Sequence, residues 1–134
     1  MNISVLHHVS LVTSDLDRSV KFYRDAFGLE QITRPPFKSV GAWLAFGSFQ
    51  IHLIVKPNGT FRGKSTIDTG DTHFAIRVED FEATVSQLAG KGFREDAAED
   101  DPMRLLLIRG GVAGFPQAYL LDPDWNIIEI NAAG

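Results

Sequence analysis

The sequence predicts an α+β fold made of two βαβββ modules, and three observations lead to that prediction. The run HVSLVTSD at His8–Asp15 returns as HFAIRVED at His73–Asp80, each a strand-like segment that ends in aspartate. Apolar residues at helical spacing follow each aspartate. These residues are Leu16, Val20 and Tyr23 in the first half and Phe81, Val85 and Leu88 in the second. Short alternating segments separated by glycine and proline then complete each half.

Composition restricts the class of protein. At 134 residues the chain suits one domain with a proper core, with module one at about 1–56, a linker at about 57–70 and module two at about 71–134. A net charge of −4 and a pI near 5.5 argue against nucleic acid as the main partner, because phosphate binding needs a clustered basic surface. No apolar run is long enough to span a bilayer, and no secretory segment fits before the first strand, so we expect a cytoplasmic protein that does not bind membranes. With no cysteine, histidines and carboxylates must carry any chemistry.

The first half is predicted to begin with a strand that leads into a capped helix. Its strand candidates span about 3–13, 29–34, 41–46 and 49–55. Asp15 is expected to cap the helix and Gly28 to end it. Pro35-Pro36 stops the second strand, because proline cannot pair within a central ladder.

The second half is predicted to repeat this order. Its strand candidates span about 72–78, 93–97, 103–109, 116–121 and 126–131. A helix at 81–90 is expected between the first two, capped by Asp80 and ended by Gly90 and Gly92. An acidic loop that contains Pro102 and a turn at 122–124 separate the later strands.

Strand parity is expected to place the chemistry-bearing side chains on one face of each sheet, because successive side chains alternate between faces. In four of the predicted strands the apolar residues share one parity and a potential ligand takes the other. These ligands are His8, His52, His73 and Glu129. We expect the apolar faces to pack against the helices and the opposite faces to be concave. His7 has the wrong parity and is not an expected ligand.

Two imidazoles and a carboxylate on adjacent strands suit a borderline divalent metal, with positions left open for water and substrate. We predict that His8, His73 and Glu129 are ligands. His52 is either a fourth ligand or a nearby base or hydrogen-bond donor. Zn, Ni, Mn, Fe or Co would each suit such a set.

Aromatic and basic residues are the candidates for substrate contact. Trp43 and Tyr119 would either line an apolar cleft or pack in the core. Arg77 shares its face with His73 by parity and is the most interesting of the basic residues. Those on or near loops would hold an anionic substrate or, more often, lie in solvent. They are Arg34, Lys38, Arg62, Lys64, Arg104 and Arg109.

Two segments carry a resemblance to a known family. The run from His8 to Gly28, HVSLVTSDLDRSVKFYRDAFG, resembles the opening module of the glyoxalase, bleomycin resistance and extradiol dioxygenase superfamily, which has the vicinal oxygen chelate fold. The run LDPDWNIIE at Leu121–Glu129 is similar to its closing strand. The resemblance implies two βαβββ modules that form an incomplete barrel around a central cleft with a divalent metal, commonly in a homodimer. It places the metal ligands at His8, His52, His73 and Glu129.

Two positions depart from the family pattern. Trp125 stands where the closing turn usually has glycine, which would put a ring beside the last strand as packing or as a lid. His52 stands where lyases and epimerases of the family often have Glu or Gln, which weakens a direct transfer of the glyoxalase mechanism.

The predicted function is a metal-dependent enzyme of glyoxalase type, a lyase or isomerase or a thiol transferase, that acts on a small oxygenated metabolite or toxin by bidentate chelation. Glu129 and His52 are the expected catalytic residues. One alternative is a non-catalytic protein that sequesters a drug or metabolite, as in bleomycin resistance. A second is an extradiol-type dioxygenase, since two histidines and a carboxylate form the facial triad of non-haem iron enzymes.

Overall fold

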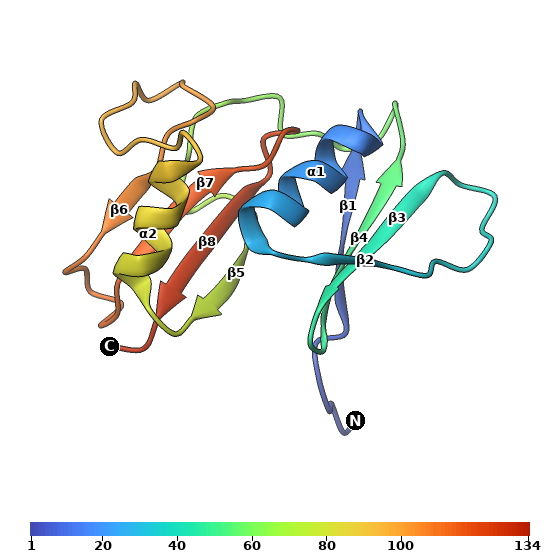
Figure 1. The fold of residues 1–134 in the computed structure, drawn as a ribbon, viewed down its shortest axis with the longest axis horizontal. Helices are drawn as coiled ribbons and strands as arrows, with labels where there is room; N and C mark the ends of the chain where they lie inside the picture. The colour runs from blue at the N-terminus through green and yellow to red at the C-terminus, as the bar shows by residue number, and fades with distance from the viewer. The chain divides into compact units, whose positions relative to one another are not determined.

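The computed structural model describes all 134 residues, which divide into two compact units, 1–61 and 62–134 (Figure 1). Each unit contains one helix and one four-stranded sheet. This is the α+β architecture of two modules that the sequence predicts. The division falls within the stretch predicted to be a linker.

The first unit follows the order β-α-β-β-β. Its elements are β1 (His8–Thr13), α1 (Leu16–Phe27), β2 (Glu30–Ile32), β3 (Gly41–Phe46) and β4 (Phe49–Val55). The strand order in its sheet is β1-β4-β3-β2, in which β1 runs parallel to β4 and the other neighbours are antiparallel. The first and last strands of the unit are therefore direct neighbours.

The second unit repeats this order and this topology. Its elements are β5 (His73–Val78), α2 (Phe81–Gly90), β6 (Leu106–Ile108), β7 (Gln117–Leu121) and β8 (Ile127–Ala132). The strand order is β5-β8-β7-β6, again with the first and last strands parallel and adjacent. The internal repeat of the sequence is thus a repeat of structure.

Both helices begin where the sequence predicts. The side chain of Asp15 accepts a hydrogen bond from the Arg18 N–H at 3.1 Å, and that of Asp80 accepts one from the Ala83 N–H at 2.9 Å. Each aspartate thereby satisfies a backbone donor that the first helical turn leaves free. Helix α1 ends at Gly28, whose φ of 67° lies in the left-handed region that favours glycine.

The structure corrects two of the predicted strands. Residues 3–7 do not extend β1, because β4 begins at Phe49, beside the register partner of His8, and offers no strand for them to pair with. Residues 93–97 form no strand either: Arg94 makes only an isolated bridge to Arg104. The acidic residues and proline that follow favour turns over a ladder.

The predicted apolar face of each sheet is observed. In β4, Ile51 and Leu53 are 0% and 1% exposed, and in β8 Ile128 and Ile130 are likewise 0% and 1% exposed. Helix α1 contacts β2, β3 and β4, and α2 contacts β8, so one face of each sheet forms a core with its helix. Neither helix combines the length and hydrophobicity needed to cross a bilayer.

Candidate functional site

The second unit brings His73 and Glu129 together. His73 opens β5, and Glu129 lies in the middle of β8, the strand parallel to it. The His73 Nε2 and the Glu129 Oε2 are 3.2 Å apart, and the side chains are 26% and 8% exposed. Two of the predicted ligands therefore form a pair on the face that strand parity indicates.

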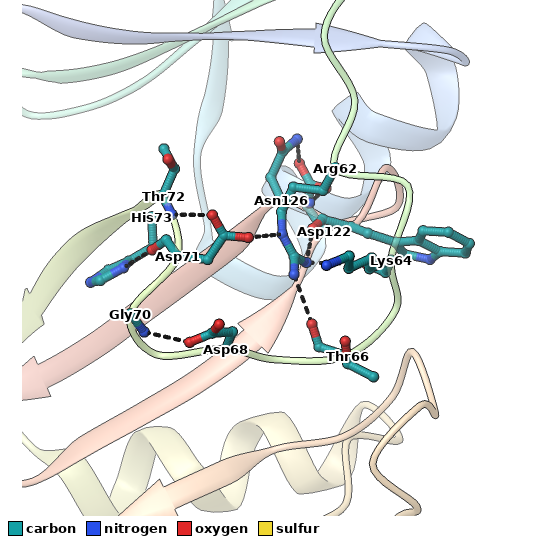
Figure 2. Close-up of polar contacts among 11 residues, drawn as sticks. Arg62, Lys64, Thr66, Asp68, Gly70, Asp71, Thr72, His73, Asp122 and Asn126 are labelled. Carbon is teal, nitrogen blue, oxygen red and sulfur yellow. Dashed lines mark hydrogen bonds and ion pairs between the residues drawn. The ribbon is translucent and has the colours of Figure 1, made fainter.

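A backbone contact fixes the ring of His73. Its Nδ1 lies 2.8 Å from the carbonyl oxygen of Asp71 (Figure 2). A carbonyl oxygen only accepts, so Nδ1 carries a proton, and in the neutral ring Nε2 turns its lone pair toward the Glu129 carboxylate. Two lone pairs repel at this distance unless a cation or a proton lies between them. A metal-binding histidine has this arrangement, with its second nitrogen held by the backbone.

Three side chains donate hydrogen bonds to Glu129. The Gln117 Nε2 and the Asn131 Nδ2 lie 3.1 and 3.0 Å from Oε1, and the Tyr119 hydroxyl lies 3.2 Å from Oε2. These donors come from β8 itself and from its neighbour β7. The carboxylate is only partly in contact with solvent, and its orientation is set by protein groups.

This network keeps Glu129 charged. Burial by itself raises the pKa of Glu129, but the hydrogen bonds from Asn131, Gln117 and Tyr119 and the proximity of His73 lower it more, so the net pKa lies below the ordinary value. Burial, followed by the charge of Glu129, raises the pKa of Tyr119. At neutral pH the site therefore holds an ionised carboxylate beside a neutral phenol.

Arg77 extends the same network along β5. Its Nε donates to the Asn131 Oδ1 at 2.8 Å, and its guanidinium carbon lies 5.0 Å from the centre of the Phe115 ring. Arg77 and Asn131 are register partners on β5 and β8. The positive charge of Arg77 thus lies on the face that carries His73 and Glu129, as parity predicts.

The first unit stacks three aromatic rings on its corresponding face. The centres of the His8 and His52 rings are 3.9 Å apart at an interplanar angle of 15°, and those of His52 and Trp43 are 4.0 Å apart at 5°. The three residues come from β1, β4 and β3, which are adjacent in the sheet. His52, in the middle of the stack, is 6% exposed. Parity predicts the shared face, and the structure adds direct ring contact.

The environment of His52 favours the neutral imidazole. Its Nε2 lies 2.8 Å from the Gln50 Oε1, an acceptor, so Nε2 carries the proton and Nδ1 the lone pair. Burial, followed by the charges of His8, His7 and Arg34, lowers the pKa of His52. The neutral form is the one that binds a metal or accepts a proton.

His7 lies beside this stack, which parity did not predict. Its Nδ1 is 2.9 Å from the His8 Nδ1, and its ring meets those of His8 and His52 edge-on, with centres 5.1 and 6.2 Å away. Because β1 begins at His8, the alternation of a strand does not apply to His7.

The turn before β8 explains the unusual Trp125. Its φ of 67° makes it the one non-glycine residue with a positive φ, which accounts for the glycine that the family pattern usually has there. The Asp122 carboxylate fixes the turn by accepting the Asp124 and Asn126 N–H groups at 3.0 and 2.9 Å. The indole packs against a buried cluster of Tyr119, Leu121 and Ile127.

Most of the basic residues near loops contact the protein itself. Arg34 donates to the backbone and the hydroxyl of Ser39, and Arg104 donates to the Ala97 carbonyl. Arg109 pairs with Glu82 at 2.8 Å. Neither unit gathers three or more His, Asp or Glu side chains into a group suited to a metal ion. Each unit instead contains one pair of predicted ligands in contact, His8 with His52 in the first and His73 with Glu129 in the second.

The family model described as Glyoxalase/Bleomycin resistance protein/Dioxygenase superfamily matches residues 5–130. The chain belongs to this superfamily. The match extends over most of both units and includes every site residue predicted from the sequence.

Several curated relatives of this chain are named lactoylglutathione lyases. "Glyoxylase I 4" of Arabidopsis thaliana is 30% identical over 97% of this chain and 71% of its own length. A lactoylglutathione lyase of the same plant is 31% identical over 95% of this chain, and a probable one of Vibrio parahaemolyticus is 29% identical over 92%. This chain spans 44% of that plant lyase and 86% of the bacterial one. The lyase activity in these names belongs to the relatives, and this chain spans less than half of the plant enzyme.

Solved structures confirm the predicted fold. A putative glyoxalase family protein from Bacillus anthracis superposes with a TM-score of 0.78 at 20% identity, over 100% of this chain and 98% of that one. A fosfomycin resistance protein from Listeria monocytogenes gives 0.71 at 18% identity, over 99% and 96%. Likeness at this identity shows the glyoxalase-like fold alone.

The groups that orient His73 and Glu129 are not predicted from the sequence. Gln117 and Asn131 were not named as site residues, although each lies two positions from Tyr119 or Glu129 and so shares its face. Asp71 contributes a backbone oxygen, which no side-chain pattern reveals.

Proposed function

We propose that this protein is a divalent-metal-dependent enzyme of glyoxalase type, a lyase or isomerase or a thiol transferase, that acts on a small oxygenated metabolite or toxin. One observation carries the proposal: the His73 Nε2 and the Glu129 Oε2, two atoms that can each bind a metal ion, face each other at 3.2 Å. A cation that both atoms share accounts for this approach, and a metal ion bound by the nitrogen and the oxygen is the case that we propose.

The donor set fits a metal ion. Two ligand atoms that each lie about 2.1 Å from one ion are separated by roughly 3.0–3.4 Å, which brackets the His73–Glu129 distance. The Asp71 carbonyl holds the second nitrogen of the histidine, and amide and phenol donors hold the carboxylate. Such outer contacts are typical of ligands in metal sites.

His8 and His52 are the further ligands in this proposal, as the family resemblance implies. Nitrogen and oxygen donors without sulfur suit Zn, Ni, Mn, Fe or Co. Bound there, the metal would act as a Lewis acid toward two neighbouring substrate oxygens and stabilise the charge that develops on one of them.

The protein side chains would bind the substrate and move protons. Glu129 is kept ionised and His52 neutral by their lowered pKa values, so both are proposed proton acceptors. Arg77 offers its guanidinium to a negatively charged part of the substrate. Trp43 supplies an aromatic surface, and the Tyr119 hydroxyl orients Glu129 while presenting a neutral donor.

Metal analysis tests the proposal. The purified protein is analysed for metals, stripped with chelator and titrated with each candidate ion by calorimetry. We expect one ion per chain, and we expect Glu129→Gln to weaken its binding by more than the roughly 100-fold that loss of an outer-sphere contact produces. Glu99→Gln, at an exposed acid of a loop, is the matched control and should bind as the wild type does.

The outcomes separate the candidate functions. Failure of the wild type to take up any ion overturns the proposal and favours a sequestering protein, whose ligand binding would be indifferent to chelator. Iron-dependent oxygen uptake with catechols would instead identify a dioxygenase. Formation of lactoylglutathione, the compound in the names of several relatives, is the first lyase activity to assay. The proposal includes a homodimer, which sedimentation velocity would test.

A further inference from the structure

Arg62 lies at the start of the second unit and has a side chain that is only 11% exposed. Figure 2 shows its guanidinium surrounded by the chain that leads from Arg62 to His73. Its Nε donates to the Asp71 carboxylate at 3.2 Å, and its Nη1 donates to the carbonyls of Lys64 and Trp125 at 3.1 and 2.8 Å. Its Nη2 donates to the Thr66 carbonyl at 2.8 Å.

These contacts commit Arg62 to the protein. A guanidinium has five N–H donors in a rigid fork, and each of its three nitrogens here has a partner in the chain. The sequence alone left Arg62 among the basic residues that would hold an anion or lie in solvent. Its contacts describe a third role, a clamp that joins separate segments of one unit.

One arm of the clamp reaches His73 through Asp71. One carboxylate oxygen of Asp71 accepts from Arg62, and the other accepts from the Thr72 N–H at 2.8 Å. The carbonyl of the same residue accepts from the His73 Nδ1. Asp71 is therefore held on its side-chain side while its backbone orients the imidazole.

The other arm reaches the turn before β8. The carbonyl that accepts from Arg62 belongs to Trp125, the residue with the left-handed backbone. Two residues later β8 begins, and that strand carries Glu129. A single guanidinium thus contacts the residues that precede both strands of the His73–Glu129 pair.

We propose that Arg62 is a positioning residue that fixes the starts of β5 and β8, so that the His73 imidazole keeps its proton on Nδ1 and faces Glu129. This inference rests on the proposed metal site for its functional meaning. The orientation of His73 is a property of the ion-free chain and is measured separately.

The test compares Arg62→Met with Arg104→Met. The first variant keeps an apolar stem and removes the fork. The second removes another arginine-to-carbonyl bond of the same unit, to Ala97, which does not lead to His73 or Glu129. In each ion-free protein, long-range ¹⁵N–¹H spectra of the neutral imidazoles report the tautomer of His73, and calorimetry then gives the affinity for the ion that the wild type binds.

We expect the wild type and Arg104→Met to keep a proton on the His73 Nδ1, where it is bonded to the Asp71 carbonyl oxygen. Arg62→Met should show a mixture of tautomers and bind the ion roughly 10- to 100-fold more weakly. Arg62→Lys should not restore the wild-type behaviour, because an ammonium cannot bridge the four acceptors. Asp71→Asn loses one of the two oxygen acceptors and should shift the tautomer in the same direction by less. If Arg62→Met does not fold, the Asp71→Asn variant tests the positioning role in its place.

The inference is overturned if the His73 tautomer is unchanged in Arg62→Met, or in Asp71→Asn if Arg62→Met is unfolded. Arg62 would then contribute to stability only. A tautomer shift in a protein whose wild type binds no ion supports the positioning role and refutes the proposed metal-dependent function. The two failures are therefore distinguishable.

Discussion

The two units share a scaffold and differ in what they place around one equivalent position. His52 on β4 and Glu129 on β8 are equivalent, because their register partners Ser10 and Ala75 each lie two residues after the histidine that begins the first strand of the unit. In the first unit this position holds an imidazole between two rings. In the second it holds a carboxylate among hydrogen-bond donors.

The neighbouring register positions explain this difference. Gln117, Tyr119 and Asn131 surround Glu129, and their counterparts around His52 are Gly41, Trp43 and Ile54. A side chain at position 41 has no room, since an added Cβ would lie 2.3 Å from the Leu53 carbonyl oxygen and 3.0 Å from the Arg34 guanidinium. The two units thus share a backbone arrangement. The second unit surrounds its carboxylate with hydrogen-bond donors, whereas the first unit surrounds its imidazole with aromatic rings.

The largest expected effect is on the packed core, which both units share. Ile51 and Ile128 are equivalent by register and are both fully buried. Replacing either with alanine should lower the free energy of unfolding by about 2–5 kcal/mol, because each leaves a cavity in a packed core. Urea unfolding of the two variants measures this. A loss below about 1 kcal/mol in one of them would mean that its unit lacks the core that the equivalence implies.

A smaller change in the free energy of unfolding is expected from the surroundings of Glu129 and His52, in which the two units differ. Asn131→Ala removes a donor from a buried carboxylate and should lower the free energy of unfolding by about 1–3 kcal/mol, with a rise in the pKa of Glu129. Gln50→Ala removes the hydrogen-bond partner of the neutral His52 and should lower it by only about 0.5–1.5 kcal/mol. Both are compared in ion-free protein by urea unfolding. Equal losses would refute the distinction between a charged network and a ring stack.

The smallest expected effect is a difference in acid sensitivity between the two units. It is small because only one titrating group in each unit is involved. The pKa of His52 is lowered from 6.5, so its stabilising contribution is complete above pH 6.5 and declines as the pH falls toward the lowered value. The pKa of Glu129 is lowered from 4.5, so its contribution is complete above pH 4.5 and declines only below it. Between pH 6.5 and 4.5, amide exchange protection should fall in β4 and not in β8. Equal falls in both strands, or a fall that persists in His52→Gln, would contradict this.

Much of the fold and part of the site follow from the sequence. The internal repeat identifies the equivalent strands, and strand parity places all four candidate ligands on the faces where the structure has them. Both features can be read from the sequence because they recur at regular intervals along the chain. The clamp by Arg62 and the donors around Glu129 were not predicted. They depend on which residues meet across strands and on backbone oxygens, and neither property has a period along the chain. The prediction of a strand at 93–97 is wrong because the chain turns within it, where the Ala97 N–H bonds to the Arg94 carbonyl.

The adjacency of β5 and β8 has a consequence for the order of folding. These are the first and last strands of their unit, so His73 and Glu129 meet only after the whole intervening chain has closed. Closing such a loop is slow, because its entropy is lost before the long-range contact forms. An ion bound by the pair would therefore act as a removable cross-link between the two ends of a folding unit. It would slow unfolding while leaving the folding rate nearly unchanged, since it binds only what has already formed.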